Sequence, residues 1–189
     1  MNGSYGSATN LPDHYKNNLN ITQGQTDLKP ERSKNFELGL IKEYGWGTTG
    51  IKLYKSKVSD AFTYLDPDNN WLTDNAYYKN DGTVDIKGAE LTLDTELFSW
   101  QLDANIDFNQ AINKSTGLQK GRRPNRSIGI NVSKTSGKWK RSANWTAKSW
   151  AWDKDAHTNN IKLGGYGLLN LTTSYYFNED LSVYFNQTN

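Results

Sequence analysis

The chain has 189 residues and a formal net charge of +2, which is too small to indicate a nucleic-acid or strongly acidic partner. Its mean hydropathy is −0.83, and no apolar run approaches the ~18 residues that a membrane helix requires. The 16 Gly, 11 Tyr and 7 Trp, with no Cys and one Met, are typical of a β-rich protein with glycine turns and aromatic bands.

The first residues contain neither a charged segment nor an apolar segment of the kind found in a secretory signal peptide. A membrane protein of the cell envelope is expected to begin with one. We therefore expect a chain that is either soluble or without its natural start.

Alternating apolar and polar residues, typical of a strand with two unlike faces, then recur along the chain. The first such strand contains Phe36 and Leu40, and a short glycine turn leads to a second strand that starts at Ile51 and runs toward Tyr64. The phase of the second strand slips before Val58, which predicts a β-bulge or a bend there.

After a long polar segment, residues 65–82, alternation resumes at residues 89–94. A turn of two or three residues leads into the longest strand, residues 98–112, in which nearly every even position is apolar and the odd positions from Ser99 to Asn109 are polar. At roughly 3.3 Å per residue this strand is about 45 Å long, and with a tilt of about 45° it rises about 30 Å, the thickness of a bilayer core. Such a length favours a transmembrane β-barrel.

The remaining sequence adds two further pairs of strands. A polar link at residues 113–125 precedes strands at residues 128–132 and 139–147, and a second link at residues 152–165 precedes the last pair. Eight strands are thus predicted, with connections that alternate between short and long. Outer-membrane barrels have this asymmetry, with tight periplasmic turns and long external loops.

Aromatic residues gather at both ends of the predicted strands. Those at the short turns are Tyr44, Trp46, Phe98, Trp100, Trp139, Tyr175 and Phe177, and those at the opposite ends are Tyr64, Trp150, Trp152 and Tyr166. Two such bands are typical of interfacial girdles. We predict an all-β fold that forms part of an antiparallel transmembrane β-barrel, with a soluble carbohydrate-binding β-sandwich as the alternative.

Several segments resemble one family. TDLKPERSKNFELGL (residues 26–40) is similar to the N-P-x-L-x-P-E-x-S signature of TonB-dependent outer-membrane transporters, and SYGSATNLPDHY (residues 4–15) resembles the strand end and loop before it. YKNDGTVDIKGAELTL (residues 78–93) resembles their Y-x-N-x-x-x-A-x-I-x-G-V-E strand, with Ile86, Gly88 and Glu90 in register. The late segments at residues 120–132 and 161–189 match the late strands of the family.

Within the family, the segments KVSDAFTY, RRPNRS and KLGGYGLLNLTTSY are most similar to those of vitamin B12 (cobalamin) transporters. Ferric-siderophore or haem receptors share most of these elements and remain an alternative. No enzymatic function is implied.

The resemblance implies a barrel of about 22 strands with an N-terminal plug domain that is pulled by periplasmic TonB. We expect residues 1–189 to be a C-terminal part of such a barrel, without the plug domain and the final strand. A barrel portion of this kind leaves open sheet edges in lipid, so we do not expect it to transport a ligand alone.

The sequence gives little support for a metal or a catalytic centre. Asp66, Asp68 and Asn70 have the spacing of a calcium loop, but Trp71 and Tyr77 stand where an EF-hand needs Gly and Glu. We favour a solvated acidic turn over a looser calcium site and expect no metal or cofactor. The two histidines, His14 and His157, are interpreted as surface residues, and no hydrolase, zinc-protease or phosphate-loop motif is present.

Two groups of loop residues are candidates for binding. Arg122, Arg123 and Arg126, together with Lys120, form the clearest basic cluster, which either contacts lipopolysaccharide phosphates at the barrel rim or is a solvated loop. Large flat ligands can be covered by aromatic side chains, and the candidates for such contacts are Trp71, Tyr77, Tyr78, Trp150 and Trp152. The same aromatic residues also fit an outer interfacial belt.

Overall fold

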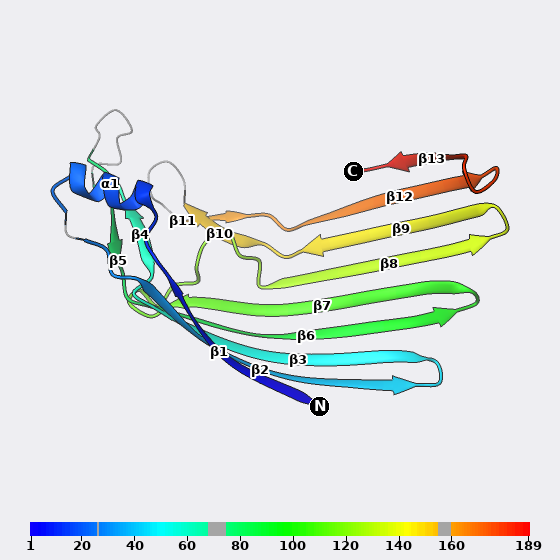
Figure 1. Cartoon of the computed structure of the whole chain (residues 1–189), viewed down its shortest axis with the longest axis horizontal. Coiled ribbons are helices and arrows are strands. Elements are labelled where there is room, and N and C mark those ends of the chain that lie inside the picture. The colour runs from blue at the N-terminus through cyan, green and yellow to red at the C-terminus, as the bar shows by residue number, and fades with distance from the viewer. Residues whose placement is uncertain (26, 68–74, 155–159) are drawn as a thin grey trace.

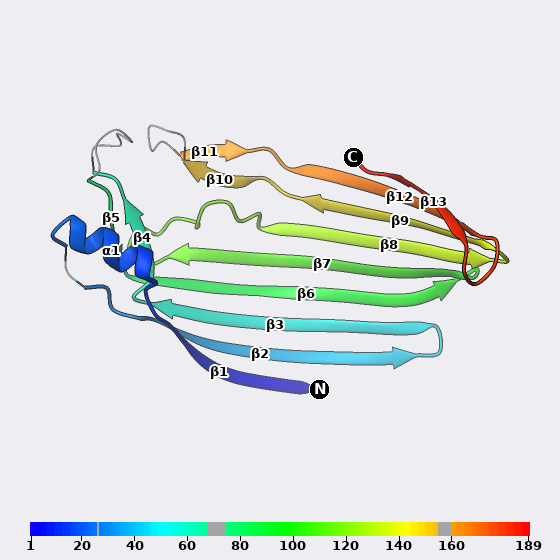
Figure 2. The same cartoon turned by 45° about the horizontal axis from the view of Figure 1, so that its top comes forward.

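One antiparallel sheet of nine strands dominates the computed structural model, which describes residues 1–25, 27–67, 75–154 and 160–189. The strands lie side by side in chain order (Figures 1 and 2). They are β1 (Asn2–Asn10), β2 (Glu31–Tyr44), β3 (Gly47–Ser59), β6 (Thr83–Leu97), β7 (Trp100–Asn113), β8 (Arg126–Ser136), β9 (Trp139–Lys148), β12 (Tyr166–Tyr176) and β13 (Ser182–Gln187). The eight predicted strands are confirmed, and β1 adds a ninth to the sheet.

The connections between these strands alternate in length as predicted. Short turns gather at one end of the sheet, on the right in Figure 1, and the long connections lie at the other end. Three of the long connections contain further structure. These elements are the helix α1 (His14–Thr22), the hairpin of β4 (Phe62–Leu65) with β5 (Tyr77–Asn80), and the hairpin of β10 (Ala151–Lys154) with β11 (Asn160–Leu163).

The sheet is a single layer with almost no apolar core. Among the described residues the buried apolar ones are Leu28, Ala61, Ala76, Val84, Ala111 and Ala151, whereas large apolar side chains such as Phe36 and Leu40 stay exposed along the strands. A β-sandwich needs a second sheet packed about 10 Å away to bury such a face. The sandwich alternative is therefore wrong, and the apolar face is left to meet lipid.

No bulge interrupts β3, contrary to the prediction. Its pairing with β2 continues without a slip from Arg32↔Ser59 to Tyr44↔Gly47, and its pairing with β6 is equally continuous. The apparent change of phase arises because the face that carries Ile51 and Leu53 continues with Lys55 and Lys57. The composition of the face changes there, while the pairing register of the strand does not.

The second predicted strand was also too long. β3 ends at Ser59, and Asp60 has a φ of +57°, a left-handed conformation that turns the chain out of the sheet. Tyr64 therefore lies in β4, which pairs only with β5 in a separate hairpin.

The longest predicted strand begins two residues later than expected. Phe98 and Ser99 have φ values of +52° and +61° and form the two-residue turn between β6 and β7, where Leu97 pairs with Trp100. Two positive φ values in a two-residue hairpin loop define a type I′ turn. Phe98 is 93% exposed and belongs to the turn, although its position fits the alternating pattern.

The helix α1 was not predicted. Asp13 is its N-cap and accepts a hydrogen bond of 2.8 Å from the backbone N–H of Lys16. The same carboxylate forms an ion pair with the Lys16 ammonium. The helix HYKNNLNIT has no apolar stripe, so periodicity could not reveal it.

Candidate functional site

The cross-strand register divides the side chains of the sheet into an apolar and a polar face, because directly paired residues project to the same side. The apolar face contains Leu40, Ile51, Leu91, Ile106 and Ile128, which are paired in sequence across five strands. The polar face contains the residues between them. In an outer-membrane barrel the first face meets lipid and the second lines the lumen.

The members of the predicted aromatic band that lie in strands, Tyr44, Trp100, Trp139 and Tyr175, are on the apolar face, whereas Trp46, Phe98 and Phe177 lie in the turns or just beyond a strand. Tyr44 stacks on Trp46 with ring centroids 5.0 Å apart, and Trp139 contacts Tyr175 edge to face at 4.8 Å. Cations cover these rings: the Lys42 ammonium lies 4.9 Å from the centre of Tyr44, and the Lys134 ammonium 5.6 Å from that of Trp100. Aromatic rings beside basic groups are the expected composition of a membrane interface.

The band predicted at the opposite end does not form one ring on the apolar face. Tyr166 pairs with Lys148, which in turn pairs with Ser127, and this register places Tyr166 on the polar face. Tyr64 and Trp152 lie in the separate loop hairpins. On the sheet itself, the apolar face at this end carries Tyr5, Phe36 and Phe108, none of which was predicted to belong to the band.

On the polar face, the Tyr54 side chain links three strands. Its hydroxyl donates a hydrogen bond of 3.2 Å to Asp107 Oδ1 on β7, and Asn109 Nδ2 donates to the other oxygen of the same carboxylate. Between them on β6 lies Gly88, where a Cβ atom would collide with the Tyr54 ring. This contact explains the glycine of the I-x-G-x-E segment, and the following Glu90 forms an ion pair with Lys52 on β3.

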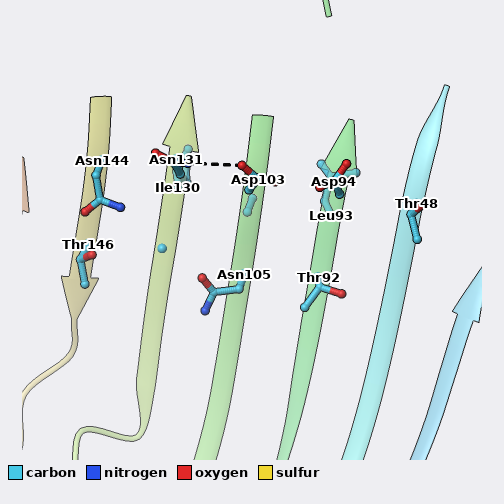
Figure 3. A pocket seen from close by; sticks show the side chains of 12 residues that line it. Thr48, Thr92, Leu93, Asp94, Asp103, Asn105, Ile130, Asn131, Asn144 and Thr146 are labelled. Carbon is cyan, nitrogen blue, oxygen red and sulfur yellow. Dashed lines mark hydrogen bonds between the residues drawn. The ribbon is translucent and has the colours of Figure 1, made fainter. Parts of the chain in front are cut away.

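A shallow hollow of about 400 Å³ lies on the polar face, nearer the short turns. Figure 3 shows Asp103, Asn105, Asn131 and Asn144 around it, on β7, β8 and β9. Asn131 Nδ2 donates to Asp103 Oδ2 at 3.3 Å, and Gln101 Nε2 donates to the neighbouring Asp94 at 3.2 Å. Amides and carboxylates of this kind can bind water or the polar surface of a domain inside the lumen.

Side-chain amides join the long connections by donating to the carbonyl and accepting from the N–H of one backbone residue, as a paired strand does. Asn20 of α1 is 2% exposed, and it donates to the carbonyl and accepts from the N–H of Tyr78, both at 2.8 Å. Asn80 forms the same pair of bonds with Lys29 and also donates to the carbonyl of Asp60. The first two long connections therefore form one hydrogen-bonded unit above the sheet.

The glutamate of the P-E-x-S segment closes this unit at the strand ends. Glu31 Oε2 accepts a bond of 2.8 Å from Asn10 Nδ2 on β1, and Oε1 accepts one of 2.7 Å from the backbone N–H of Phe62 on β4. One carboxylate thus holds three segments that are far apart in the sequence. Sequence reasoning quoted Glu31 as part of a motif but had no means of naming its partners.

The candidate aromatic residues fall into two separate groups. Tyr77 and Tyr78 begin β5, and the Tyr78 ring meets Tyr64 edge to face at 5.4 Å and lies 5.6 Å from the Lys16 ammonium. Trp150 and Trp152 form an edge-to-face pair at 5.5 Å, and each is 38% exposed. Trp71 lies outside the described residues.

The arginine candidates also separate. The Arg122 guanidinium is 79% exposed and forms an ion pair with Asp153, while its backbone N–H donates to the carbonyl of Trp152 at 2.6 Å. Arg123 is exposed in the same connection. Arg126 begins β8 and pairs with Phe108, which places it on the apolar face. Arg122 is therefore bonded to the segment that carries Trp152, whereas Arg126 lies on the apolar face of β8.

In the part of the chain that the structure describes, no cluster of three or more His, Cys, Asp or Glu side chains could hold a metal ion. Asp68 and Asn70 of the acidic turn, and His157, lie outside that part; His14 begins α1. None of the described helices is long and apolar enough to cross a membrane.

A protein-family model described as "TonB dependent receptor-like, beta-barrel" matches residues 2–189. The chain belongs to this family. Barrels of TonB-dependent receptors lie in the outer membrane of Gram-negative bacteria, and this segment is part of the wall of such a barrel. The family consists of transporters and receptors, which accords with the alternating faces and the asymmetric connections described above.

Curated relatives include two transporters of one kind. The vitamin B12 transporter of Photobacterium profundum is 29% identical over 168 residues, which are 85% of this chain and 26% of the relative. That of Vibrio cholerae is 28% identical over 189 residues, which are 97% of this chain and 29% of the relative. The chain thus spans less than a third of the length of these relatives.

Solved structures show the same fold at low sequence identity. The ferric enterobactin receptor of Pseudomonas aeruginosa superposes with a TM-score of 0.79 at 18% identity, covering 99% of this chain and 32% of the receptor. The pyoverdine receptor of P. aeruginosa has a TM-score of 0.75 at 18% identity, covering 99% and 29%. A copper transporter, OprC, also has a TM-score of 0.75 at 18% identity, covering 94% of this chain and 28% of that protein.

Proposed function

We propose that this chain forms a C-terminal part of the barrel of a TonB-dependent active transporter whose cargo is cobalamin. The similarity to two vitamin B12 transporters, at 28–29% identity over 85–97% of the chain, carries the choice of cargo. The segment acts as barrel wall and cargo-binding loops, and it has no enzymatic role.

Each part of the segment has its own role in such a transporter. The apolar face contacts lipid, and the polar face around Asp103 and Asn131 contacts a plug domain that TonB pulls during transport. The plug domain, TonB and the remaining barrel strands belong to the complete transporter. The long connections, of which the first two are held together by Asn20, Asn80 and Glu31, present the cargo-binding surface.

Among the aromatic candidates, we assign the main ligand contact to Trp150 and Trp152. Both rings are partly exposed, and their edge-to-face arrangement leaves ring surface free for a large flat ligand. The Lys162 ammonium lies 4.6 Å from the centre of the Trp150 ring and adds a positive charge beside it. Tyr78 is committed to Tyr64 and Lys16, so Tyr77 and Trp71 are the secondary candidates.

Cobalamin uptake by the complete transporter, expressed in a strain without its own transporter, tests this function. We expect uptake of cobalamin that depends on TonB. Replacing Trp150 and Trp152 with alanine is expected to weaken cobalamin binding at least tenfold, about 1.4 kcal/mol or more. Trp46→Ala, which removes an exposed tryptophan at the opposite end of the sheet, is the matched control and should leave cobalamin affinity unchanged.

The alternative cargoes are tested in the same strain. Uptake of a ferric siderophore or haem without uptake of cobalamin would overturn the cargo and retain the class of transporter. Equal cobalamin affinity in the tryptophan variant and the parent would overturn the assigned contact residues.

A further inference from the structure

Four lysines form a continuous cationic patch on the apolar face, at the end of the sheet that bears the long connections. Lys34 on β2 pairs directly with Lys57 on β3, and Lys55 on β3 pairs directly with Lys87 on β6. All four side chains are exposed. We refer to Lys34, Lys55, Lys57 and Lys87 as the lysine patch.

The lysine patch lies at the outer boundary of the apolar band. Lys34 is ten residues from Tyr44, the aromatic residue at the short turn of the same strand. At roughly 3.3 Å per residue and a tilt of about 45°, these ten residues rise about 23 Å, close to the ~25 Å height of the lipid-facing band of outer-membrane barrels. The patch therefore stands at the level of the lipid headgroups in the outer leaflet.

Among the described residues, none of the four patch lysines has an ion-pair partner. The ion pairs in the described ranges involve Lys16, Lys52, Lys114 and Arg122. Asp85, the carboxylate opposite Lys57 on this face, binds Lys114 at 3.3 Å instead. Like charges directly opposite each other destabilise a sheet. Binding of an external anion between the lysines would reduce this repulsion.

Apolar side chains lie beside and below the patch. Phe36 pairs with Lys55 and with Tyr5 on β1, at the level of the lower lysines, and Phe108 pairs with Ala89, two residues below Lys87. Phe108 also pairs with Arg126, which extends the positive charge to β8. A ligand that fits this order of groups has acidic groups above and hydrocarbon chains below.

We propose that the lysine patch binds the phosphate groups of a phosphorylated glycolipid of the outer leaflet, namely lipopolysaccharide. The lysine ammonium groups contact the phosphates while the acyl chains lie against Phe36, Phe108 and the aliphatic residues below them. The site is separate from Arg122 and Arg123 of the predicted arginine cluster, which lie in the connection before β8, where Arg122 is paired with Asp153; it shares only Arg126 with that cluster. It is independent of the cargo of the transporter.

Binding of lipid A to the complete transporter in nanodiscs tests the site. In a variant with all four patch lysines changed to glutamine, we expect affinity for bisphosphorylated lipid A to fall at least tenfold. Affinity for dephosphorylated lipid A is expected to change less than twofold. The matched control changes four lysines near the short turns, Lys42, Lys134, Lys138 and Lys140, to glutamine and should retain the parental affinity.

Two pairwise variants replace the fourfold variant if that one does not fold. Lys34→Gln with Lys57→Gln, and Lys55→Gln with Lys87→Gln, should each lose part of the affinity for bisphosphorylated lipid A. A variant with all four lysines changed to arginine should retain that affinity. Parental affinity in the folded fourfold variant, or in both pairwise variants, would overturn the proposal. So would a loss seen only when Arg122 and Arg123 are changed to serine, because the site would then lie in the loop. Cargo binding, measured on the same samples, reports on the proposed function separately.

Discussion

At the scale of single residues, Tyr54 shows how a long side chain joins strands that have no backbone bonds to each other. β3 and β7 are separated by β6, and the Tyr54 hydroxyl reaches Asp107 because Gly88 leaves room for the ring between them. The glycine is required here for close approach, not for turning the chain. A Cβ atom at this position would collide with the Tyr54 ring and also with the backbone oxygen of Phe108.

Replacing Gly88 with alanine is expected to destabilise the complete barrel by about 1–3 kcal/mol, because the added methyl group displaces Tyr54 or forces the strands apart. Gly6→Ala is the matched control, since Gly6 also lies on the polar face of a strand and has open space around its Cα. The urea midpoint of unfolding from detergent measures both. Equal midpoints for the two variants would refute the account of Gly88.

Asp13, the N-cap of α1, makes the stability of this helix depend on pH. The hydrogen bond from the Lys16 ammonium, followed by that from the Lys16 backbone N–H, holds the pKa of the Asp13 carboxyl below its ordinary value of 3.8. Because the folded pKa is the lower one, the ionised cap stabilises the helix above the pKa of the unfolded chain. That stabilisation is lost as the pH falls through the folded pKa.

Amide hydrogen exchange in α1, corrected for the intrinsic rate, should therefore be constant above about pH 4 and should rise below it. In Asp13→Asn the amide oxygen still caps the helix but carries no titrating charge. The variant should lack the rise in exchange on acidification. A rise of the same size in both proteins would show that another group controls the helix.

At the scale of secondary-structure elements, each hairpin has its own turn chemistry. The β6–β7 turn uses Phe98 and Ser99 at positive φ, where glycine or asparagine is usual. A left-handed conformation costs a non-glycine residue roughly 1–2 kcal/mol, and replacing Ser99 with glycine removes this cost. The gain in stability is reduced in part because glycine is more flexible in the unfolded chain.

We expect Ser99→Gly to stabilise the complete barrel by up to about 1 kcal/mol in the same urea assay. Ser142→Gly is the control, because Ser142 lies within β9 and pairs with Ser133 and Thr172. There the glycine should cost roughly 0.5–1 kcal/mol. Destabilisation by both changes would mean that the turn holds Ser99 for another reason.

The wall of the barrel could be predicted from the sequence, and its ends could not. Alternation in residues 98–112 specified a strand, but Phe98 fits the same alternation from within a turn, so only its φ value reveals its place. Lys55 and Lys57 looked like a change of phase because the lipid face stops being apolar there. The helix α1 is held by Asn20 and Asp13, single polar contacts that leave no periodic pattern.

The candidate site was predictable only as a list of residue types. Glu31 and Gly88 stood out as parts of motifs, but their partners Asn10, Phe62 and Tyr54 lie between 21 and 34 residues away and are known only from the register of the hairpins. The lysine patch was missed for the same reason. Its signal, lysines continuing the phase of Ile51 and Leu53, was present in the sequence and was interpreted as an irregular strand.

At the scale of the whole molecule, the apolar face is layered. Aromatic residues with nearby cations mark the short turns, aliphatic residues fill the middle, and Phe36 and Phe108 precede the lysine patch at the other end. The two boundaries thus differ in chemistry. This difference matches a membrane whose two leaflets have different headgroups, as the outer membrane has.

The sheet has two edges, β1 and β13, each paired on one side only within the described residues. In lipid, each unpaired backbone group costs several kcal/mol, and an exposed strand edge is a template for another chain. Expressed alone in detergent, this 189-residue chain is expected to form oligomers, whereas the complete transporter should be monomeric. Light scattering coupled to size exclusion distinguishes these outcomes, and a monodisperse monomer of the 189-residue chain would contradict the expectation.

The uninterrupted pairing from β2 to β7 has an evolutionary consequence. Inserting one residue into any of these strands would move every later side chain of that strand to the opposite face, exchanging lipid-facing and lumen-facing positions. Gains and losses of residues can then accumulate only in the long connections. Natural variation in such a gene is free to remodel what the outside surface recognises while the membrane wall stays the same length.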